Sequence, residues 1–240
     1  MAEFKSFRMP KLCIIPTPIG NLEDITLRAI RMLKESNLIL AEDTRVTRVL
    51  LSHLDLHKRM ISYHVNNEHA QLEETVRQIQ THEQVALVSD AGTPGISDPG
   101  FLLVRACIER GIEVECLPGP TAFVPALVVS GLPADRFFFE GFLPHKKGRQ
   151  SRLEYLATLD HTVIFYESPY RLVKTLEQIA QVMGAHRKVS VSKEISKMHE
   201  THFRGTIEEA VVYFSNLVVK GEFVIVVGKA NFANSEPYNS

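Results

Sequence analysis

The alternation of short apolar runs with helix-periodic segments is the feature that most constrains the fold of this chain. The first half contains compact apolar runs with the length of buried strands, at 12–15, Leu38–Ala41, 85–88 and 114–117. Between them, apolar residues recur at helical spacing, as at Leu72, Val76 and Ile79. Strands that alternate with helices predict an α/β domain with a mainly parallel sheet.

The second half repeats this alternation and predicts a second α/β unit. Its expected strands lie at 137–139, 163–166, 189–192 and 223–227. We therefore expect two domains, 1–120 and 121–240, each with a mixed sheet flanked by helices. A cleft between two such domains is the default place for a ligand.

Local signals set the expected helix boundaries. Asp24 is expected to cap the first helix, Ser168-Pro169 to open a later one that ends at Gly184, and Thr206 to start a capping box with Glu209. The segment 121–130 is almost wholly apolar, so we expect a helix buried all round, kinked at Pro125. The polar tail 231–240 is expected to be frayed.

Charge and hydropathy exclude several classes of protein. Lys plus Arg number 27 and Asp plus Glu number 28, so general attraction to a polyanion is weak and any RNA contact needs a local basic patch. No run approaches the roughly 20 apolar residues of a membrane span, and 1–11 lacks a signal-peptide core. Cys13, Cys107 and Cys116 fit no zinc or redox motif, which predicts reduced, buried thiols in a cytoplasmic protein.

Common catalytic motifs are missing from the sequence. There is no dinucleotide fingerprint, phosphate-binding loop or Gly-x-Ser-x-Gly elbow. His53 and His57 could share a helix face, and His199 and His202 are three residues apart, but no carboxylate or cysteine completes a metal set. We expect no metal.

Three small-residue loops follow predicted strands and point to a ligand site. The segment SDAGTPGISDPG at 89–100 follows one strand, and 16–21 and 118–122 follow two others. Loops at the carboxyl ends of parallel strands bind ligands in α/β folds, and glycines let a ligand approach the backbone. The alternative is a long polar turn in which Asp98 caps the next helix.

Charged residues follow further strands. Glu42, Asp43 and Arg45 lie at 41–45 with Arg48 one turn on, Glu167 ends the strand at 163–166, and Lys193-Glu194 follow 189–192. The alternative for Asp43 is helix capping beside solvated arginines, and for Glu167 it is a hydrogen-bond acceptor at a helix start.

The run His145-Lys-Lys-Gly-Arg149, extended by Arg152, is the densest basic segment. It follows Phe142, which could stack on a base, so at a cleft rim it could hold an RNA backbone. The alternative is an ordinary solvated loop.

Six motifs in register resemble one family. They are TPIGNLEDITLRA at 17–29, AEDTR at 41–45, SDAGTP at 89–94, PGPTA at 118–122, EGFLP at 140–144 and FYESP at 165–169. Together they resemble the bacterial 16S ribosomal RNA cytidine ribose-2′-O-methyltransferases of the tetrapyrrole methylase superfamily, over roughly residues 10 to 230.

The resemblance implies a two-domain α/β homodimer that binds S-adenosylmethionine in the interdomain cleft and acts on 16S ribosomal RNA in the small ribosomal subunit. It implies cofactor contacts at Ile19, Ser89, Asp90, Ala91, Gly92, Thr93, Thr121, Ala122, Glu167 and Ile195. Glu167 replaces the apolar residue common in porphyrin-modifying members, which favours the RNA branch. Many members of that branch carry a helical C-terminal extension, whereas this chain ends soon after its last predicted strand.

The chemistry of that reaction selects further candidates. A ribose hydroxyl needs a base to take its proton, and Asp43, Glu167 and Glu194 are the candidates. Candidates for phosphate or sugar contacts are Arg45, Arg48, Lys146, Lys147, Arg149 and Lys193. Two other hypotheses remain open: a tetrapyrrole methylase, and a non-catalytic ribosome-assembly factor of the same fold.

Overall fold

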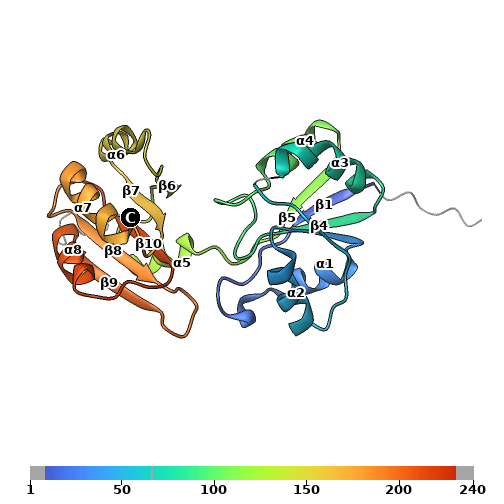
Figure 1. The fold of residues 1–240 in the computed structure, drawn as a ribbon, viewed down its shortest axis with the longest axis horizontal. Helices are drawn as coiled ribbons and strands as arrows, with labels where there is room; N and C mark the ends of the chain where they lie inside the picture. Colours follow the sequence, from blue (N-terminus) through green and yellow to red (C-terminus); the bar gives the residue numbers. More distant parts are fainter. Residues whose placement is uncertain (1–8, 66, 231–240) are drawn as a thin grey trace, which may run out of the picture. The chain divides into compact units, whose positions relative to one another are not determined.

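The computed structural model describes residues 9–65 and 67–230, which form two compact units, Met1–Thr121 and Ala122–Ser240 (Figure 1). The segment 1–8, part of the stretch searched for a signal peptide, and the tail 231–240, expected to be frayed, lie outside the described residues. In the described ranges, no helix is long and apolar enough to cross a bilayer.

The first unit is a parallel sheet between helices. Within the described residues the strand order is β3-β2-β4-β1-β5, and each pair is parallel. The strands are β1 (Lys11–Ile14), β2 (Leu38–Ala41), β3 (Met60–Ser62), β4 (Gln84–Val88) and β5 (Glu113–Cys116). The helices are α1 (Leu27–Glu35), α2 (Thr44–His53), α3 (Glu68–Gln80) and α4 (Phe101–Glu109), with a short 3-10 turn η1 (Leu22–Asp24).

Both faces of this sheet are covered, which explains the uninterrupted apolar runs. Leu12 and Ile14 of β1 pack in a cluster with residues of α3 and α4, whereas Cys13 and Ile15 pack with residues of α1 and α2. A strand buried on both faces has no need of polar alternation. The short edge strand β3 is only half buried and carries no such run, so it was not predicted.

The second unit has a mixed sheet. Its order in the described part of the chain is β6-β7-β10-β8-β9, in which β6 and β7 are parallel and the other pairs antiparallel. The strands are β6 (Phe137–Phe142), β7 (Thr162–Glu167), β8 (Lys188–Lys193), β9 (Thr201–Thr206) and β10 (Phe223–Val227). The helices are α5 (Phe123–Ser130), α6 (Arg149–Ala157), α7 (Leu172–Met183) and α8 (Ile207–Ser215).

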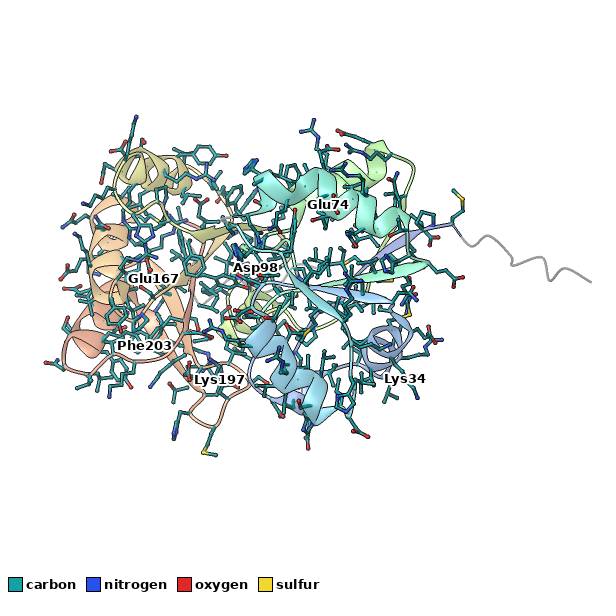
Figure 2. All side chains as sticks on the ribbon, turned by 45° about the vertical axis from the view of Figure 1, so that its right-hand side comes forward. Lys34, Glu74, Asp98, Glu167, Lys197 and Phe203 are labelled. Carbon is teal, nitrogen blue, oxygen red and sulfur yellow. The ribbon has the colours of Figure 1, made fainter. Side chains whose placement is uncertain are left out.

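One core cluster joins this sheet to α6, α7 and α8, and it includes Leu153, Phe165, Leu176 and Phe214. Glu167, at the end of β7, lies among these strands and helices, whereas Lys34 in the first unit is exposed on α1 (Figure 2).

Two predicted helix boundaries are confirmed and two are wrong. Thr206 forms the capping box with Glu209, and Gly184 follows α7. Asp24 is not the cap of α1, because it ends η1 and Thr26 caps α1 by accepting from Ala29 N–H. The helix expected at Ser168-Pro169 begins at Leu172 instead, because residues 168–171 form a separate turn.

Further expectations about local structure are not met. Pro125 lies in the first turn of α5, where a missing N–H costs no helical hydrogen bond, and Val128 of the same helix is 71% exposed. The basic run enters helix α6, which was not predicted. Cys116 is exposed on the edge strand β5, unlike the buried Cys13 and Cys107.

Candidate functional site

The three small-residue loops of the first unit are hydrogen-bonded to one another. Thr17 and Gly92 exchange two backbone hydrogen bonds of 2.9 Å, and the Thr17 hydroxyl donates to the Ser89 carbonyl at 3.1 Å. The Thr93 hydroxyl donates to the Pro120 carbonyl at 3.0 Å and lies 2.6 Å from the Thr121 hydroxyl. The loops after β1, β4 and β5 therefore form one surface at the carboxyl edge of the sheet.

Two glycines allow this close packing. A Cβ on Gly119 would lie 2.6 Å from the Cβ of Pro16, closer than side chains tolerate. Gly92 has a φ of +83°, and a Cβ there would lie 3.5 Å from Ile19. Gly119 therefore allows two loops to approach closely, whereas at Gly92 the positive φ, rather than lack of space, favours glycine.

Carboxylates gather at the same edge. The N–H of Asp43 donates to Oδ1 of Asp90 at 3.0 Å, and the N–H of Asp90 donates to Oε2 of Glu42 at 3.2 Å. Burial raises the pKa of Glu42 and that of Asp90. Burial, together with the charge of Glu42, raises the pKa of Asp98 to about 7, although a hydrogen bond from Ser89 opposes the shift. Negative charge is therefore costly here, and a cationic ligand would be favoured.

Asp98 does not cap the helix that follows it. Helix α4 begins after Gly100, which makes no side-chain cap, so the capping alternative for the 89–100 loop is wrong. A carboxyl group with a pKa near neutrality is instead typical of functional sites.

Asp43 is the N-cap of α2, which confirms the helix-capping alternative stated for it above. Its carboxylate accepts from Arg45 N–H at 2.8 Å and lies 2.6 Å from Nη2 of Arg45, whose side chain is 86% exposed. The side-chain hydrogen bond from Arg45 lowers the pKa of Asp43 to about 2. Such a carboxylate is a weak base near neutral pH. Arg48 is exposed on the same helix.

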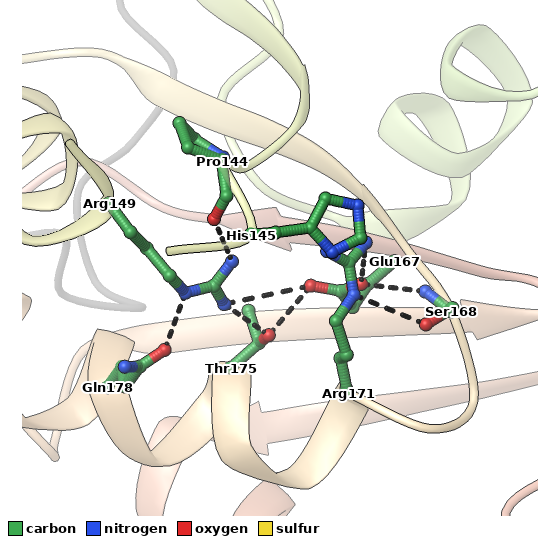
Figure 3. A network of polar contacts seen from close by, with 8 residues as sticks. All are labelled: Pro144, His145, Arg149, Glu167, Ser168, Arg171, Thr175 and Gln178. Carbon is green, nitrogen blue, oxygen red and sulfur yellow. Dashed lines mark hydrogen bonds and ion pairs between the residues drawn. The ribbon is translucent and has the colours of Figure 1, made fainter. Parts of the chain in front are cut away.

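Glu167 is enclosed by hydrogen-bond donors of the second unit (Figure 3). Its side chain is 1% exposed. Oε1 accepts from Ser168 N–H at 2.8 Å and lies 2.8 Å from Nη2 of Arg171. Oε2 accepts from the Thr175 hydroxyl at 2.7 Å and lies 3.8 Å from Nη2 of Arg149. These contacts match the alternative in which Glu167 is an acceptor at a helix start.

Arg149 is buried in the same network, with its guanidinium engaged by acceptors of the protein, and its expected contact with phosphate stays a prediction. Its Nε donates to Gln178 at 2.7 Å, its Nη1 to the Pro144 carbonyl at 3.1 Å, and its Nη2 to the Thr175 hydroxyl at 2.6 Å (Figure 3). Spacing in a basic run could not distinguish this arginine from its neighbours.

The rest of the basic run faces solvent. His145, Lys146 and Lys147 are exposed, and in the described ranges neither lysine makes an ion pair. Arg152 forms a bidentate ion pair with Glu140, in which Nε donates to Oε1 at 2.8 Å and Nη2 donates to Oε2 at 2.6 Å. The two lysines are therefore the members of the run that are free to bind an anion.

Glu194 is held by its neighbours after β8. It accepts from Glu222 N–H at 2.8 Å and lies 3.1 Å from the Lys197 ammonium. Partial burial acts to raise the pKa of Glu194, but the hydrogen bonds from Glu222 and Lys197 outweigh it, so the pKa is lowered. The adjacent Ile195 is buried, and Lys193 ends β8 half-buried.

The structure brings together part of the predicted cofactor site. Ile19 and Thr121 lie in the first unit with 89–93, and their loops are in contact. Ala122, Glu167 and Ile195 belong to the second unit, so their part in binding the same ligand stays a prediction. Thr17 and Asp98, which were not among the proposed contacts, are buried or half-buried at this edge.

No group of His, Cys, Asp and Glu suited to a metal ion occurs among the residues that the structure describes. His53 ends α2 and His57 lies beyond it, so the two do not share a helix face.

Comparison with known proteins identifies the class to which this fold and these loops belong. The family model of Tetrapyrrole (Corrin/Porphyrin) Methylases matches residues 11–211, and the chain belongs to this family. A solved uroporphyrin-III C-methyl transferase from Thermus thermophilus, complexed with S-adenosyl homocysteine, has the same fold. It superposes with a TM-score of 0.66 at 22% identity, over 91% of this chain and 97% of that one.

More similar relatives carry a more specific name, "Ribosomal RNA small subunit methyltransferase I". The protein of that name from Synechocystis is 48% identical over 91% of this chain and 79% of its own length. The one from Thermotoga maritima is 45% identical over 91% of this chain and 98% of its own length. The resemblance drawn from the six motifs is confirmed.

Proposed function

We propose that this chain is an S-adenosylmethionine-dependent methyltransferase that methylates the ribose 2′-oxygen of a cytidine in 16S ribosomal RNA. The observation that carries the proposal is its 45–48% identity, along nine-tenths of its length, to proteins named as methyltransferases of small-subunit ribosomal RNA. Identity to the porphyrin-methylating enzyme is less than half as high, which favours RNA over a tetrapyrrole.

The loops of the first unit fit the cofactor. S-Adenosylmethionine, when bound, supplies an electrophilic methyl group on a sulfonium. The joined loops after β1, β4 and β5 offer backbone groups, and the carboxylates of Glu42 and Asp90 favour a cation. The contacts we propose are Ile19, Ser89, Asp90, Ala91, Gly92, Thr93, Thr121, Ala122 and Ile195.

A base must take the proton of the 2′-hydroxyl, and the contacts of each proposed candidate limit its ability to act as that base. Arg45 lowers the pKa of Asp43, and donors around Glu194 lower its pKa as well. Glu167 keeps both oxygens engaged inside the second unit. A base works best with a pKa near the working pH, so variants of Asp43, Glu167 and Glu194 should be compared by their pH–rate profiles.

The substrate is the 16S ribosomal RNA of the small subunit in this proposal. Its phosphates or sugars would contact the exposed Arg45, Arg48, Lys146 and Lys147, together with Lys193. A homodimer, which the resemblance implies, and a cytoplasmic location, which the cysteines predict, are part of the same proposal. Light scattering on the purified chain tests the dimer.

The direct test uses purified protein, S-adenosylmethionine with a labelled methyl group, and small subunits from a strain that lacks the modification. We expect label in ribosomal RNA, recovered as 2′-O-methylcytidine by mass spectrometry of the nucleosides. Label on a base, or on uroporphyrinogen offered in parallel, would contradict the proposal. Cofactor binding without any transfer would favour the assembly-factor hypothesis.

A further inference from the structure

Tyr170 is an aromatic side chain of the second unit that lies exposed to solvent. It is 96% exposed, in the turn formed by residues 168–171 between β7 and α7. A lone exposed apolar residue is common and needs no explanation. What distinguishes Tyr170 is that the backbone on both sides of it is fixed by buried polar contacts.

The turn is held at its two ends. The N–H of Ser168 donates to Glu167, and the N–H of Arg171 donates to the Ser168 carbonyl at 3.1 Å. The Arg171 guanidinium lies 2.8 Å from the Glu167 carboxylate, which is buried (Figure 3). The ring of Tyr170 is therefore presented from a turn that has already lost most of its conformational freedom, which reduces the entropy cost of binding.

The exposed basic loop lies beside this turn. Nδ1 of His145 is 3.0 Å from Nη1 of Arg171, so residues 145 and 171 meet (Figure 3). The loop that carries Lys146 and Lys147 is also fixed, because Arg149 donates to the Pro144 carbonyl and thereby joins the two ends of the loop. Glu167 contacts both arginines, so one buried carboxylate holds both segments.

The composition of these two segments is basic and aromatic. Residues 142–148 and 168–171 contain no Asp or Glu, although the chain as a whole has a net charge of −1. Phe142, which is 51% exposed, precedes the basic loop and packs edge-on against Tyr166. Exposed rings next to cations are the combination with which proteins bind single-stranded nucleic acid, by stacking on bases and pairing with phosphates.

We propose that Tyr170 stacks on an unpaired base of the RNA substrate while Lys146 and Lys147 contact the adjoining phosphates. Glu167 is a positioning residue for this surface, acting through Arg149 and Arg171. The inference rests on the proposed function, because it takes RNA to be the substrate. It adds a base-binding residue and a requirement for single-stranded RNA at this surface.

The test measures binding of a fluorescein-labelled, single-stranded RNA of about twelve nucleotides by fluorescence anisotropy. Loss of one base–aromatic stack in Tyr170→Ala should weaken binding about tenfold, which is about 1.4 kcal/mol. Tyr170→Phe, which keeps the ring, should stay within about twofold. The salt dependence of binding should not change in either variant, because no charge is lost.

The control is Tyr213→Ala. Tyr213 is an exposed tyrosine of α8 that packs on Phe203 of β9, the edge strand farthest from β6. Its removal should leave RNA binding unchanged. Equal affinities for wild type, Tyr170→Ala and Tyr213→Ala would overturn the inference, as would a Tyr170→Phe variant as weak as Tyr170→Ala.

Turnover separates this inference from the proposed function. On small subunits, Tyr170→Ala should raise KM about tenfold and leave kcat unchanged. If wild type methylates subunits and Tyr170→Ala has the same KM, the inference fails and the proposed function stands. If KM rises but oligonucleotide binding does not change, Tyr170 contacts a ribosomal protein and base stacking is refuted. If wild type transfers no methyl to RNA, the proposed function fails, and equal oligonucleotide affinities would then refute the stacking as well.

Discussion

The guanidinium of Arg171 lies 2.8 Å from the carboxylate of Glu167, four residues earlier in the chain. The pair joins the end of β7 to the start of α7, and Thr175 of α7 donates to the other carboxylate oxygen. The charge of Glu167 is therefore balanced inside the second unit by groups that do not depend on any ligand.

Glu167→Gln should therefore destabilise the protein. The variant leaves Arg171 and Arg149 without a buried counter-charge, and hydrogen bonds to charged groups contribute about 1.5–3 kcal/mol each. We expect the free energy of unfolding in urea to fall by about 2 kcal/mol. Glu177→Gln, an exposed change on the same helix α7, is the control and should be neutral.

The same variant decides whether Glu167 is also the base. As a base, its loss should reduce single-turnover methylation by about 10²-fold or more with the fold intact. As a positioning residue, its loss should raise KM for small subunits and keep the rate at saturation within about threefold. We expect the second result, because neither carboxylate oxygen is free.

Gly92→Val should weaken binding of S-adenosylmethionine at least tenfold, about 1.4 kcal/mol. Gly92 has a φ of +83°, and its backbone makes two hydrogen bonds to Thr17, so a branched side chain strains the joined loops. Gly111→Val is the control, since Gly111 also has a positive φ (+67°) but precedes β5, at the other edge of the sheet. Calorimetric titration measures both variants, and unchanged affinity in a folded Gly92→Val protein would remove this loop from the site.

The pattern of apolar residues predicted most of the fold, because the burial of a strand or helix face determines directly which of its residues are apolar. The strands β1, β2, β4, β7, β8 and β10 are runs of buried residues, and such runs are visible in sequence. The strands β3 and β9 are largely half-buried or exposed, and they were missed. The strands β5 and β6 are no better buried, but they were predicted from the segments 114–117 and 137–139. The start of α7 was misplaced because Ser168 and Pro169 suit a turn as well as a helix start.

The site was harder to predict than the fold because the environment of a charge depends on contacts distant in sequence. Arg149 and Lys147 are two residues apart, yet the first is buried against α7 and the second is exposed. Asp98 was considered as a possible helix cap, whereas burial and the charge of Glu42 raise its pKa to about 7. The i, i+4 spacing of Glu167 and Arg171 indicates an ion pair only within a helix, and Glu167 ends a strand, so spacing did not identify this pair.

Replacing Lys146 and Lys147 by glutamine should weaken binding of single-stranded RNA without changing affinity for the cofactor. Each lost phosphate contact should reduce the slope of log affinity against log salt by about 0.7. Lys34→Gln, an exposed lysine of α1, is the control. If affinity and slope both stay at wild-type values in the double variant, residues 145–148 are an ordinary solvated loop.

Small subunits should be a better substrate than protein-free 16S ribosomal RNA. The net charge of −1 provides little general attraction for a polyanion, so productive binding must rely on a defined local surface presented by the assembled particle. We expect kcat/KM on subunits to exceed that on protein-free RNA by at least tenfold. Initial-rate measurements on both substrates at the same ionic strength test this, and equal values would refute it.

Asp98→Asn should change how stability depends on pH. In the folded protein burial raises the pKa of Asp98 to about 7, whereas the unfolded value is about 3.9. Below pH 4 the group is protonated in both states and costs nothing. Between pH 4 and 7 only the folded state holds the proton, so wild-type stability falls as pH rises, and it levels off above 7.

The asparagine variant has no such group. Between pH 5 and 8 it should therefore gain about 2 kcal/mol relative to wild type, since one pKa unit corresponds to about 1.4 kcal/mol. Urea unfolding at the two pH values measures the difference. Asp135→Asn, an exposed change in the second unit, should show no relative gain. Parallel pH profiles for wild type and Asp98→Asn would mean that Asp98 ionises as freely in the folded protein as in water.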